Sequence, residues 1–304
     1  MHNGYGKKII KAPIIGFIRY SQKTRFSKYK KEKNVFEANY FEYRFNIFKN
    51  ITLKCFQNQT NMNFVLLLLH SENMPSEYQK RFNELEKENF FLYNVFLKDN
   101  EESFDETLRN TIEYVSFEQK VALTFRVDND DAVQNDFIQR LSCYLKEDFF
   151  NYSINMPNIC IIQRISDMSL MVEERYYPSN SIGIAYITNR EKYKTVMEFG
   201  NHDYLIEKTA SAILINECFG LQTINGENEA NAINTVSNCI KLYQTEQIEK
   251  YFDDNNFANM DLKCIRILKL RKFSIKKVLQ LLMPPFLFLI VRRCWRKYKI
   301  KVAS

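Results

Sequence analysis

The chain has 304 residues and a mass of 36.4 kDa, and 45% of its residues are hydrophobic. This is enough to bury the core of one large α/β domain, so wholesale disorder is excluded. The formal net charge of +7 is unevenly placed, because residues 262–304 contain 13 Lys or Arg and no Asp or Glu. The first 261 residues contain 30 Lys or Arg against 36 Asp or Glu. A nucleic-acid-binding domain carries positive charge on its folded face, so this acidic body predicts no nucleic-acid partner.

Cysteine usage and the amino terminus predict a reducing, cytoplasmic compartment. The seven Cys are odd in number and scattered, and none forms a C-x-x-C pair. This pattern predicts neither a disulfide framework nor a zinc site. Met1 to Lys11 contains no apolar run of the kind that marks a secretory signal.

Apolar runs alternate with amphipathic stretches over the first 127 residues. The runs predict buried strands at 14–20, 64–70, 90–97 and 121–127. The stretches between them predict helices at 40–59, 76–89 and 103–116. This alternation predicts an α/β fold with a mostly parallel central sheet and helices on both faces. Ligands of such folds bind beyond the carboxyl ends of the strands.

An acidic run follows the strand predicted at 121–127. Asp128, Asp130 and Asp131 place three carboxylates within four residues. Like charges this close are unfavourable unless a cation lies among them, and Mg²⁺ or Mn²⁺ prefers such oxygen ligands. We expect a helix to begin near Ala132, where its dipole favours the acidic residues. The alternative is a solvated acidic turn at a capped helix start.

Four segments resemble a bacterial family of rhamnosyltransferases over about residues 14–235. They are IRYSQKTRFS, YFEYRFNIFKNITLKCFQNQTNMNFVLLL, TFRVDNDDAVQNDFIQRL and LQTINGENEAN. This resemblance implies a GT-A-like glycosyltransferase with a D-x-D metal motif and an inverting reaction. It implies that Asp128 and Asp130 contact the nucleotide ribose and the metal, with Asp131 in support. It also implies that Arg126 stabilises the site or approaches the phosphates.

The sequence departs from this family at two places. Asn225 stands where the family usually has His, and residues 181–188 lack the usual acidic residue. The resemblance therefore leaves the catalytic base open, and Asp203, the acid nearest to His202, is predicted to have this role. His202 is predicted to bind the metal together with Asp130 and Asp131; the alternatives are that it acts as a base or lies in a surface turn.

Further candidates lie outside these motifs. Glu227 and Glu173 are the next candidates for the base, and His70 ends an apolar strand from which it can line the site or pack in the core. Arg19, Ser21 and Arg25 follow the first predicted strand, so we expect them to bind the nucleotide. The chain contains no P-loop, G-x-G-x-x-G or G-x-S-x-G, which removes support for nucleotide hydrolysis, dinucleotide redox and α/β-hydrolase functions.

The carboxyl-terminal end predicts a membrane-association segment. Residues 278–291 form a 14-residue apolar stretch, interrupted by Pro284 and Pro285, between basic flanks. Such a stretch is short for a bilayer span but suits the surface of an anionic membrane. We predict a catalytic domain at 1–245 and a basic, partly apolar helical segment at 246–304. The protein would then lie peripherally on the inner face of the cell membrane.

These observations predict a metal-dependent transfer of a sugar from a nucleotide-sugar donor to a cell-surface glycan or lipid-linked acceptor. Two alternatives stay open at this point. One is a metal-dependent phosphotransferase or nucleotidyltransferase, which also uses clustered carboxylates. The other is a non-catalytic, membrane-docked binding protein in which the acidic turn is structural.

Overall fold

The structure is a computed structural model that describes most of the chain. The described residues are 11–21, 36–98, 101–115, 120–176, 180–189, 193–200, 204–215, 217–225, 240–244, 257 and 260–268. The predicted site residues Arg25, His202 and Asp203 lie outside these ranges. Residues 269–304, which include the apolar stretch of the predicted membrane-association segment, also lie outside them.

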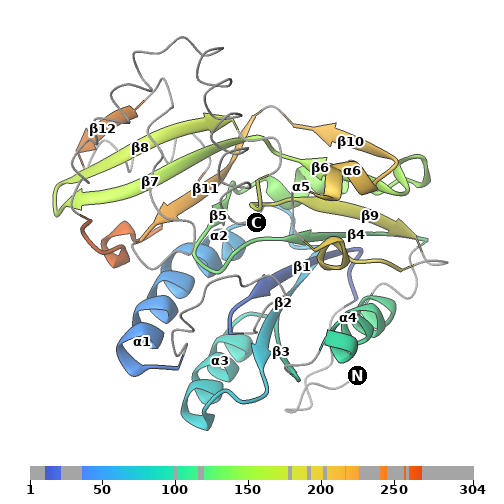
Figure 1. Cartoon of the computed structure of the whole chain (residues 1–304), viewed down its shortest axis with the longest axis horizontal. Helices are drawn as coiled ribbons and strands as arrows, with labels where there is room; N and C mark the ends of the chain where they lie inside the picture. The colour runs from blue at the N-terminus through green and yellow to red at the C-terminus, as the bar shows by residue number, and fades with distance from the viewer. Residues whose placement is uncertain are drawn as a thin grey trace, which may run out of the picture.

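A seven-stranded sheet forms the centre of the described structure (Figure 1). Its order is β10 (Ser211–Leu214), β6 (Tyr152–Asn155), β9 (Ala185–Asn189), β4 (Val121–Arg126), β1 (Ile14–Arg19), β2 (Phe64–Ser71) and β3 (Leu92–Leu97). The strands β3, β2, β1 and β4 are parallel, and β9 runs against its neighbours β4 and β6. The four predicted strands and the mostly parallel central sheet are therefore confirmed.

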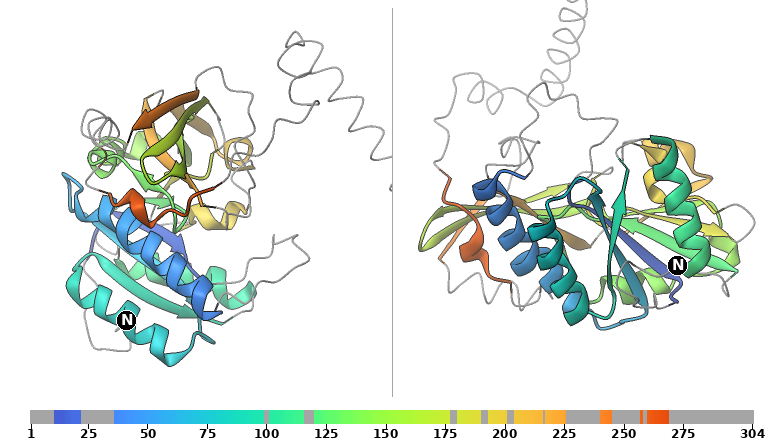
Figure 2. Two further views of the ribbon diagram at one scale, coloured as in Figure 1. Left: turned by 90° about the vertical axis from the view of Figure 1, so that its left-hand side faces the viewer. Right: turned by 90° about the horizontal axis from the view of Figure 1, so that it is seen from below.

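Helices cover both faces of this sheet because the central strands are apolar on both sides. Ile14 and Ile18 of β1 belong to the core beneath α1 (Ala38–Ile47) and α3 (Ser76–Glu88). The alternate residues Ile15 and Phe17 belong to a second cluster, with Leu108 and Val115 of α4 (Glu101–Val115). Figure 2 shows these helices on opposite sides of the strands. The prediction of helices on both faces is thus confirmed.

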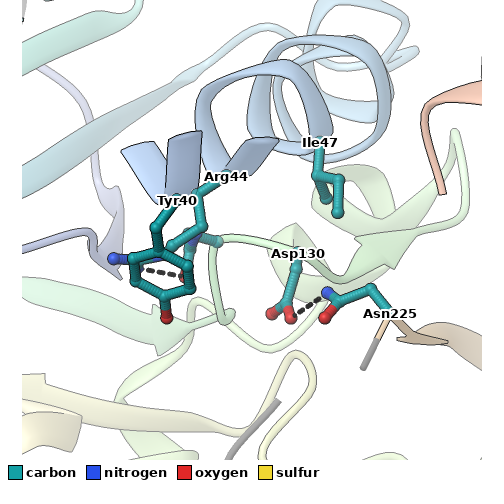
Figure 3. A pocket seen from close by; sticks show the side chains of 6 residues that line it. Tyr40, Arg44, Ile47, Asp130 and Asn225 are labelled. Carbon is teal, nitrogen blue, oxygen red and sulfur yellow. Dashed lines mark hydrogen bonds between the residues drawn. The ribbon is translucent and has the colours of Figure 1, made fainter. Parts of the chain in front are cut away.

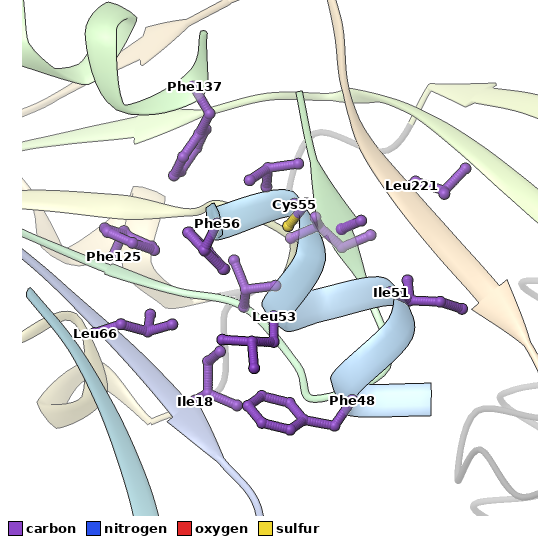
Figure 4. Packing of buried hydrophobic residues seen from close by; sticks show 14 of the residues in the cluster. Ile18, Phe48, Ile51, Leu53, Cys55, Phe56, Leu66, Phe125, Phe137 and Leu221 are labelled. Carbon is purple, nitrogen blue, oxygen red and sulfur yellow. The ribbon is translucent and has the colours of Figure 1, made fainter. Parts of the chain in front are cut away.

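A bent helical segment lies between the main sheet and a second sheet (Figure 4). It consists of α1, a π-helical turn η1 (Phe48–Thr52) and α2 (Leu53–Gln57), where a helix or a helix pair was predicted at 40–59. Phe48, Ile51 and Phe56 are fully buried along it. Phe56 of α2 stacks on Phe125 of β4, and Leu221 of the second sheet belongs to the same cluster. Arg44 of α1 contacts Asn129, just beyond the end of β4.

The second sheet has five strands and was not predicted from the sequence. Its order is β12 (Ile240–Gln244), β8 (Ser169–Tyr176), β7 (Asn158–Ser166), β11 (Cys218–Ile224) and β5 (Ala132–Val133). The prediction of a helix that begins near Ala132 was wrong, because Ala132 and Val133 pair with Leu221 and Gly220 of β11. The helix α5 begins only at Phe137 and ends at Ser142.

Short helices complete the described elements. They are η2 (Glu147–Phe149), η4 (Val196–Phe199), α6 (Leu205–Lys208) and η6 (Leu262–Cys264). Of these, η6 belongs to the basic region at 262–304, yet Leu262 and Ile265 are buried in the main core. The basic region therefore begins inside the folded body, while the division into domains at residue 245 stays a prediction. In the described part of the chain, no helix is both long and apolar enough to cross a bilayer.

Candidate active site

The acidic loop Asp128–Asp131 joins the two sheets. It leaves the carboxyl end of β4, the edge at which parallel sheets bind ligands, and enters β5 of the second sheet. The amide of Asp131 donates to the carbonyl oxygen of Asp128 at 3.2 Å, which closes the loop into a tight turn. The three carboxylates are therefore held at a fixed junction and do not lie on a free surface turn.

Strand β11 and the residue after it hold the loop from the side of the second sheet. The Thr223 hydroxyl donates to the Asp130 carbonyl oxygen at 2.7 Å, and the Thr223 amide donates to Oδ1 of Asp131 at 3.4 Å. The Asn225 side-chain amide donates to Oδ2 of Asp130 at 2.9 Å. Asp131 is buried by this packing, whereas Asp130 is partly exposed. Asn225 thus holds the Asp130 carboxylate in a fixed orientation at the edge of the loop.

A small pocket opens between α1 and the loop (Figure 3). Its lining residues are Tyr40, Arg44, Ile47, Asn129, Asp130 and Asn225. Arg44 donates through Nη2 to the Tyr20 carbonyl oxygen at 2.5 Å and to Oδ1 of Asn129 at 3.1 Å. Its guanidinium carbon lies 4.8 Å from the Tyr20 ring centroid and 5.5 Å from that of Tyr40. The pocket therefore presents a fixed cation and a fixed carboxylate side by side.

Crowding of negative charge changes the protonation of the loop. Burial and the neighbouring charge of Asp128 raise the pKa of Asp130 to about 6, although Arg44 and the Asn225 amide oppose this shift. Burial and the charges of Asp130 and Asp128 raise the pKa of Asp131 well above its ordinary value. Two of the three acids are therefore costly to ionise together, and a cation among them would remove that cost.

Asp128 is held from the opposite side by the segment that leads into β9. The Ser181 hydroxyl donates to Oδ2 of Asp128 at 3.2 Å, and Nη2 of Arg126 lies 3.5 Å from Oδ1. The Gly183 amide donates to the Arg126 carbonyl oxygen at 3.0 Å, with Gly183 at a φ of 72° that favours glycine. The segment 181–188, notable in sequence for its lack of an acid, thus supplies a hydroxyl donor to the loop.

The side chains of the loop fit a divalent cation that a substrate helps to hold. Among the described residues, no three His, Cys, Asp or Glu side chains converge in a way that could hold a metal ion alone. Mg²⁺ and Mn²⁺ are commonly bound by one or two carboxylates together with substrate phosphates and water. Asp130, which lines the pocket, is one such carboxylate.

The other predicted nucleotide-binding residues lie at the end of β1. Arg19 is its last residue, on the face shared by Ile15 and Phe17. Ser21 is buried, and its hydroxyl accepts from the Ser71 amide at 3.1 Å, so it ties the end of β1 to that of β2. The structure therefore gives Ser21 a structural contact, and a role in nucleotide binding stays a prediction for both residues.

The predicted base Asp203 and metal ligand His202 stay predictions, because both lie outside the described residues. Their described neighbours Phe199 and Leu205 pack in the cluster on the α4 face of the main sheet. The pocket instead lies beneath α1, on the other face.

The fallback candidates for the base differ in what the structure describes. Glu227 also lies outside the described residues. Glu173 is fully buried in β8, where it accepts from Arg175 at 2.7 Å and 3.0 Å. Strand register aligns Glu173 with Ile161, and Ile161 with Gln222. Glu173 therefore shares the sheet face of Gln222, opposite the face from which Thr223 contacts the acidic loop.

Three pocket residues on α1 were missed in the sequence. Tyr40, Arg44 and Ile47 are spaced by four and three residues, which places them on one face of a helix. That spacing was available from the predicted helix, but the partner surface was not. Asn225 had been singled out as a departure from the family pattern, and it proves to hold Asp130.

Comparison with known proteins identifies the family. The family described as "Putative rhamnosyl transferase" matches residues 13–237, and this chain belongs to it. It is a glycosyltransferase, as the sequence predicted, and the family does not support the phosphotransferase or binding-protein alternatives. No curated protein matches the chain by sequence.

Solved structures with similar folds share little sequence with this chain. The structure of Staphylococcus aureus TarS 1–349 is 8% identical with a TM-score of 0.40, over 69% of this chain and 60% of that one. The same protein in complex with UDP is 10% identical with a TM-score of 0.39, over 70% and 61%. An inositol-1-phosphate CTP transferase from Thermotoga maritima is 11% identical with a TM-score of 0.33, over 71% and 89%. The chain thus spans about 60% of the length of TarS 1–349.

His70 belongs to the core and does not line the pocket. It is fully buried beside the rings of Tyr20, Phe82 and Phe96. Because the Asn94 amide nitrogen donates elsewhere, Nε2 of His70 is the donor to Oδ1 of Asn94, at 3.0 Å. Nδ1 has no hydrogen-bond partner in the described part of the chain. Burial therefore lowers the pKa of His70 to about 3.

We predict that His70 makes the protein less stable in mild acid. Its folded pKa lies below the unfolded value of about 6.5, so its contribution to stability is lost as pH falls from about 6.5 towards 3. The free energy of unfolding should then fall by up to about 1.4 kcal/mol per pH unit from this group. Denaturant unfolding of wild type and His70→Gln at pH 7, 6 and 5 measures the difference in slope. Equal slopes would contradict the prediction.

Proposed function

We propose that this glycosyltransferase transfers a sugar from a nucleotide-sugar donor to a cell-surface glycan or lipid-linked acceptor, with Mg²⁺ or Mn²⁺ at the acidic loop. The observation that carries the proposal is the pocket in which Asp130 and Arg44 lie together. A carboxylate suits a divalent cation, and a guanidinium suits phosphate oxygens. A nucleoside diphosphate bridging the two would satisfy both groups.

The chain's own residues have distinct roles in this proposal. Asp130 and Asp128 would hold the cation, which supplies neutralisation of the departing nucleotide diphosphate. Asn225 and Thr223 keep Asp130 in place, and Ser181 does the same for Asp128. Asp131, buried behind them, would support the loop and is the less accessible of the three as a metal ligand.

Arg44 would donate to the diphosphate from the opposite wall of the pocket. One of its nitrogens, Nη2, is already fixed by Tyr20 and Asn129, so the guanidinium is held in orientation before a ligand arrives. Preorganised donors stabilise developing charge without reorganisation during the reaction. Arg44 would therefore stabilise the nucleotide diphosphate as it leaves.

The transfer itself exchanges two bonds at the anomeric carbon. The bond from this carbon to the diphosphate oxygen breaks, and a bond to the acceptor oxygen forms on the opposite face, which inverts the configuration. The acceptor proton passes to a base, for which Asp203 remains the residue predicted from the sequence. The transition state resembles that of glycoside hydrolysis, with positive charge on the sugar ring.

The basic carboxyl-terminal region supports a peripheral membrane location in this proposal. Its 13 Lys or Arg within residues 262–304 would be attracted to the anionic inner face of the cell membrane. The apolar stretch at 278–291 would add burial at the interface. Such an attachment would raise the local concentration of a lipid-linked acceptor.

Asp130→Ala should abolish transfer while the protein stays folded. Loss of the cation's charge stabilisation raises the activation free energy by several kcal/mol, so kcat should fall by at least about 100-fold. A thermal-shift panel of UDP, dTDP and GDP, each with and without Mn²⁺, measures binding beside the activity. Asp148→Ala, a change at an exposed acid in η2, is the matched control. Unchanged turnover in Asp130→Ala would refute the metal site.

Arg44→Ala should weaken donor binding and transfer. A hydrogen bond to a charged group contributes about 1.5–3 kcal/mol, so kcat/KM for the donor should fall about 10- to 150-fold. Arg81→Ala is the control, since Arg81 also stacks on an aromatic ring, 4.0 Å from the Phe45 centroid, but does not line the pocket. Steady-state kinetics that show equal losses in both variants would argue against a diphosphate contact.

Two truncated chains should separate membrane attachment from folding. A chain ending at Leu268 keeps Leu262 and Ile265 in the core, so it should keep its melting temperature but no longer sediment with anionic liposomes. Full-length protein should sediment with the liposomes, because each basic residue near the anionic surface contributes about 1 kcal/mol to binding. Salt screens this attraction, so high salt should release part of the protein. A chain ending at Asp261 loses both buried side chains, each worth about 1.5–3 kcal/mol, and should melt earlier. Undiminished sedimentation of the chain ending at Leu268 would contradict the membrane proposal.

A further inference from the structure

The last described stretch of the chain, residues 260–268, packs across the outside of α1 and the second sheet. We call these residues the C-terminal strap. The Asp261 amide donates to the Asn50 carbonyl oxygen at 3.3 Å, and the Leu268 amide donates to that of Arg164 at 2.9 Å. Nη1 of Arg164 in turn donates to the carbonyl oxygens of Lys263 and Ile265 at 2.8 Å and 3.2 Å. Figure 1 shows this orange-red segment between α1 and the β7–β8 hairpin. The strap is therefore fixed at both ends.

Tyr43 connects the strap to the pocket. Its hydroxyl accepts from the Arg266 amide at 3.2 Å and donates to the Asn225 carbonyl oxygen at 3.1 Å. The Arg266 guanidinium carbon lies 3.9 Å from the centroid of the Tyr43 ring and covers it. Tyr43 is buried, so these hydrogen bonds form where water competes little. One hydroxyl thus joins the strap, α1 and the residue that follows β11.

The same residue, Asn225, contacts the acidic loop on its other side. Its side-chain amide donates to Oδ2 of Asp130 at 2.9 Å, while its carbonyl oxygen accepts from Tyr43. Tyr43 therefore fixes the main chain of Asn225, and the side chain of the same residue holds Asp130.

We propose that Tyr43 and the C-terminal strap are positioning elements of the active site, which orient Asn225 and through it the metal-binding carboxylate of Asp130. This inference rests on the proposed function, in which Asp130 holds the cation. Tyr43 lies outside the pocket lining, so its effect on the metal is indirect. The strap is then required for the site as well as for the core.

Tyr43→Phe removes only the hydroxyl and tests the proposal. It leaves the Asn225 carbonyl and the Arg266 amide without their shared partner, so Asn225 gains freedom of orientation. Changes to groups behind a metal ligand commonly reduce metal affinity 10- to 100-fold, and we expect the half-saturating Mn²⁺ concentration to rise about tenfold. The readouts are the Mn²⁺ dependence of the thermal shift given by UDP and dTDP, and the Mn²⁺ dependence of the transfer rate.

Tyr78→Phe is the matched control, because the Tyr78 hydroxyl also donates to a main-chain oxygen, that of Phe36 at 3.4 Å, away from the loop. Arg266→Ala keeps the main-chain donor but uncovers the Tyr43 ring, so it should shift the Mn²⁺ response in the same direction by less. Amide hydrogen exchange of residues 126–133 should become faster in Tyr43→Phe and stay at the wild-type rate in Tyr78→Phe.

The outcomes separate this inference from the proposed function. A Mn²⁺ response that is lost in Asp130→Ala and equal in Tyr43→Phe and Tyr78→Phe overturns the inference alone. A Mn²⁺ response retained in Asp130→Ala overturns the proposed metal site itself. A shifted Mn²⁺ response in Tyr43→Phe, with a melting temperature in the absence of metal no lower than that of Tyr78→Phe, supports a positioning role.

Discussion

The arrangement of this molecule depends on holding three carboxylates together at the end of one strand. Burial first, and then the repulsion among Asp128, Asp130 and Asp131, raise the pKa of Asp130 and of Asp131. Separate elements each hold one part of the loop: β11 and Asn225 hold Asp130 and Asp131, and Ser181 holds Asp128. The second sheet, whose strand β5 begins where the loop ends, therefore contributes to the candidate active site as well as to the core.

Much of the first half of the fold could be predicted because its signals are local. The apolar runs of β1, β2, β3 and β4 are continuous, as buried parallel strands require. The second sheet escaped prediction because its pairing is not local: Ala132 pairs with Leu221, which lies 89 residues along the chain. Pairing with β11 makes Ala132 and Val133 a strand. The sequence instead predicted a helix there, because the apolar residues that follow have helical spacing.

Only part of the candidate site could be predicted from the sequence, for the same reason. The acidic run could be found because its three acids are adjacent in sequence and follow a strand. Asn225 and Arg44 could not be assigned, because they lie 95 and 85 residues from their partners Asp130 and Asn129. For Asn225 a family pattern drew attention to the position, but only the fold shows that its amide reaches the carboxylate. The roles of Asp203 and His202 rest on sequence alone.

The π-helical turn η1 has a consequence for how this site can vary. A π turn inserts one residue into an α-helix, so the helix after it is rotated by about 100° relative to an uninterrupted one. Before the turn, α1 directs Arg44 into the pocket, and after it α2 directs Cys55 and Phe56 into the core. Loss of one residue between Phe48 and Thr52 would restore a regular helix yet break one of these two alignments. The number of residues in this segment is therefore constrained by both alignments at once.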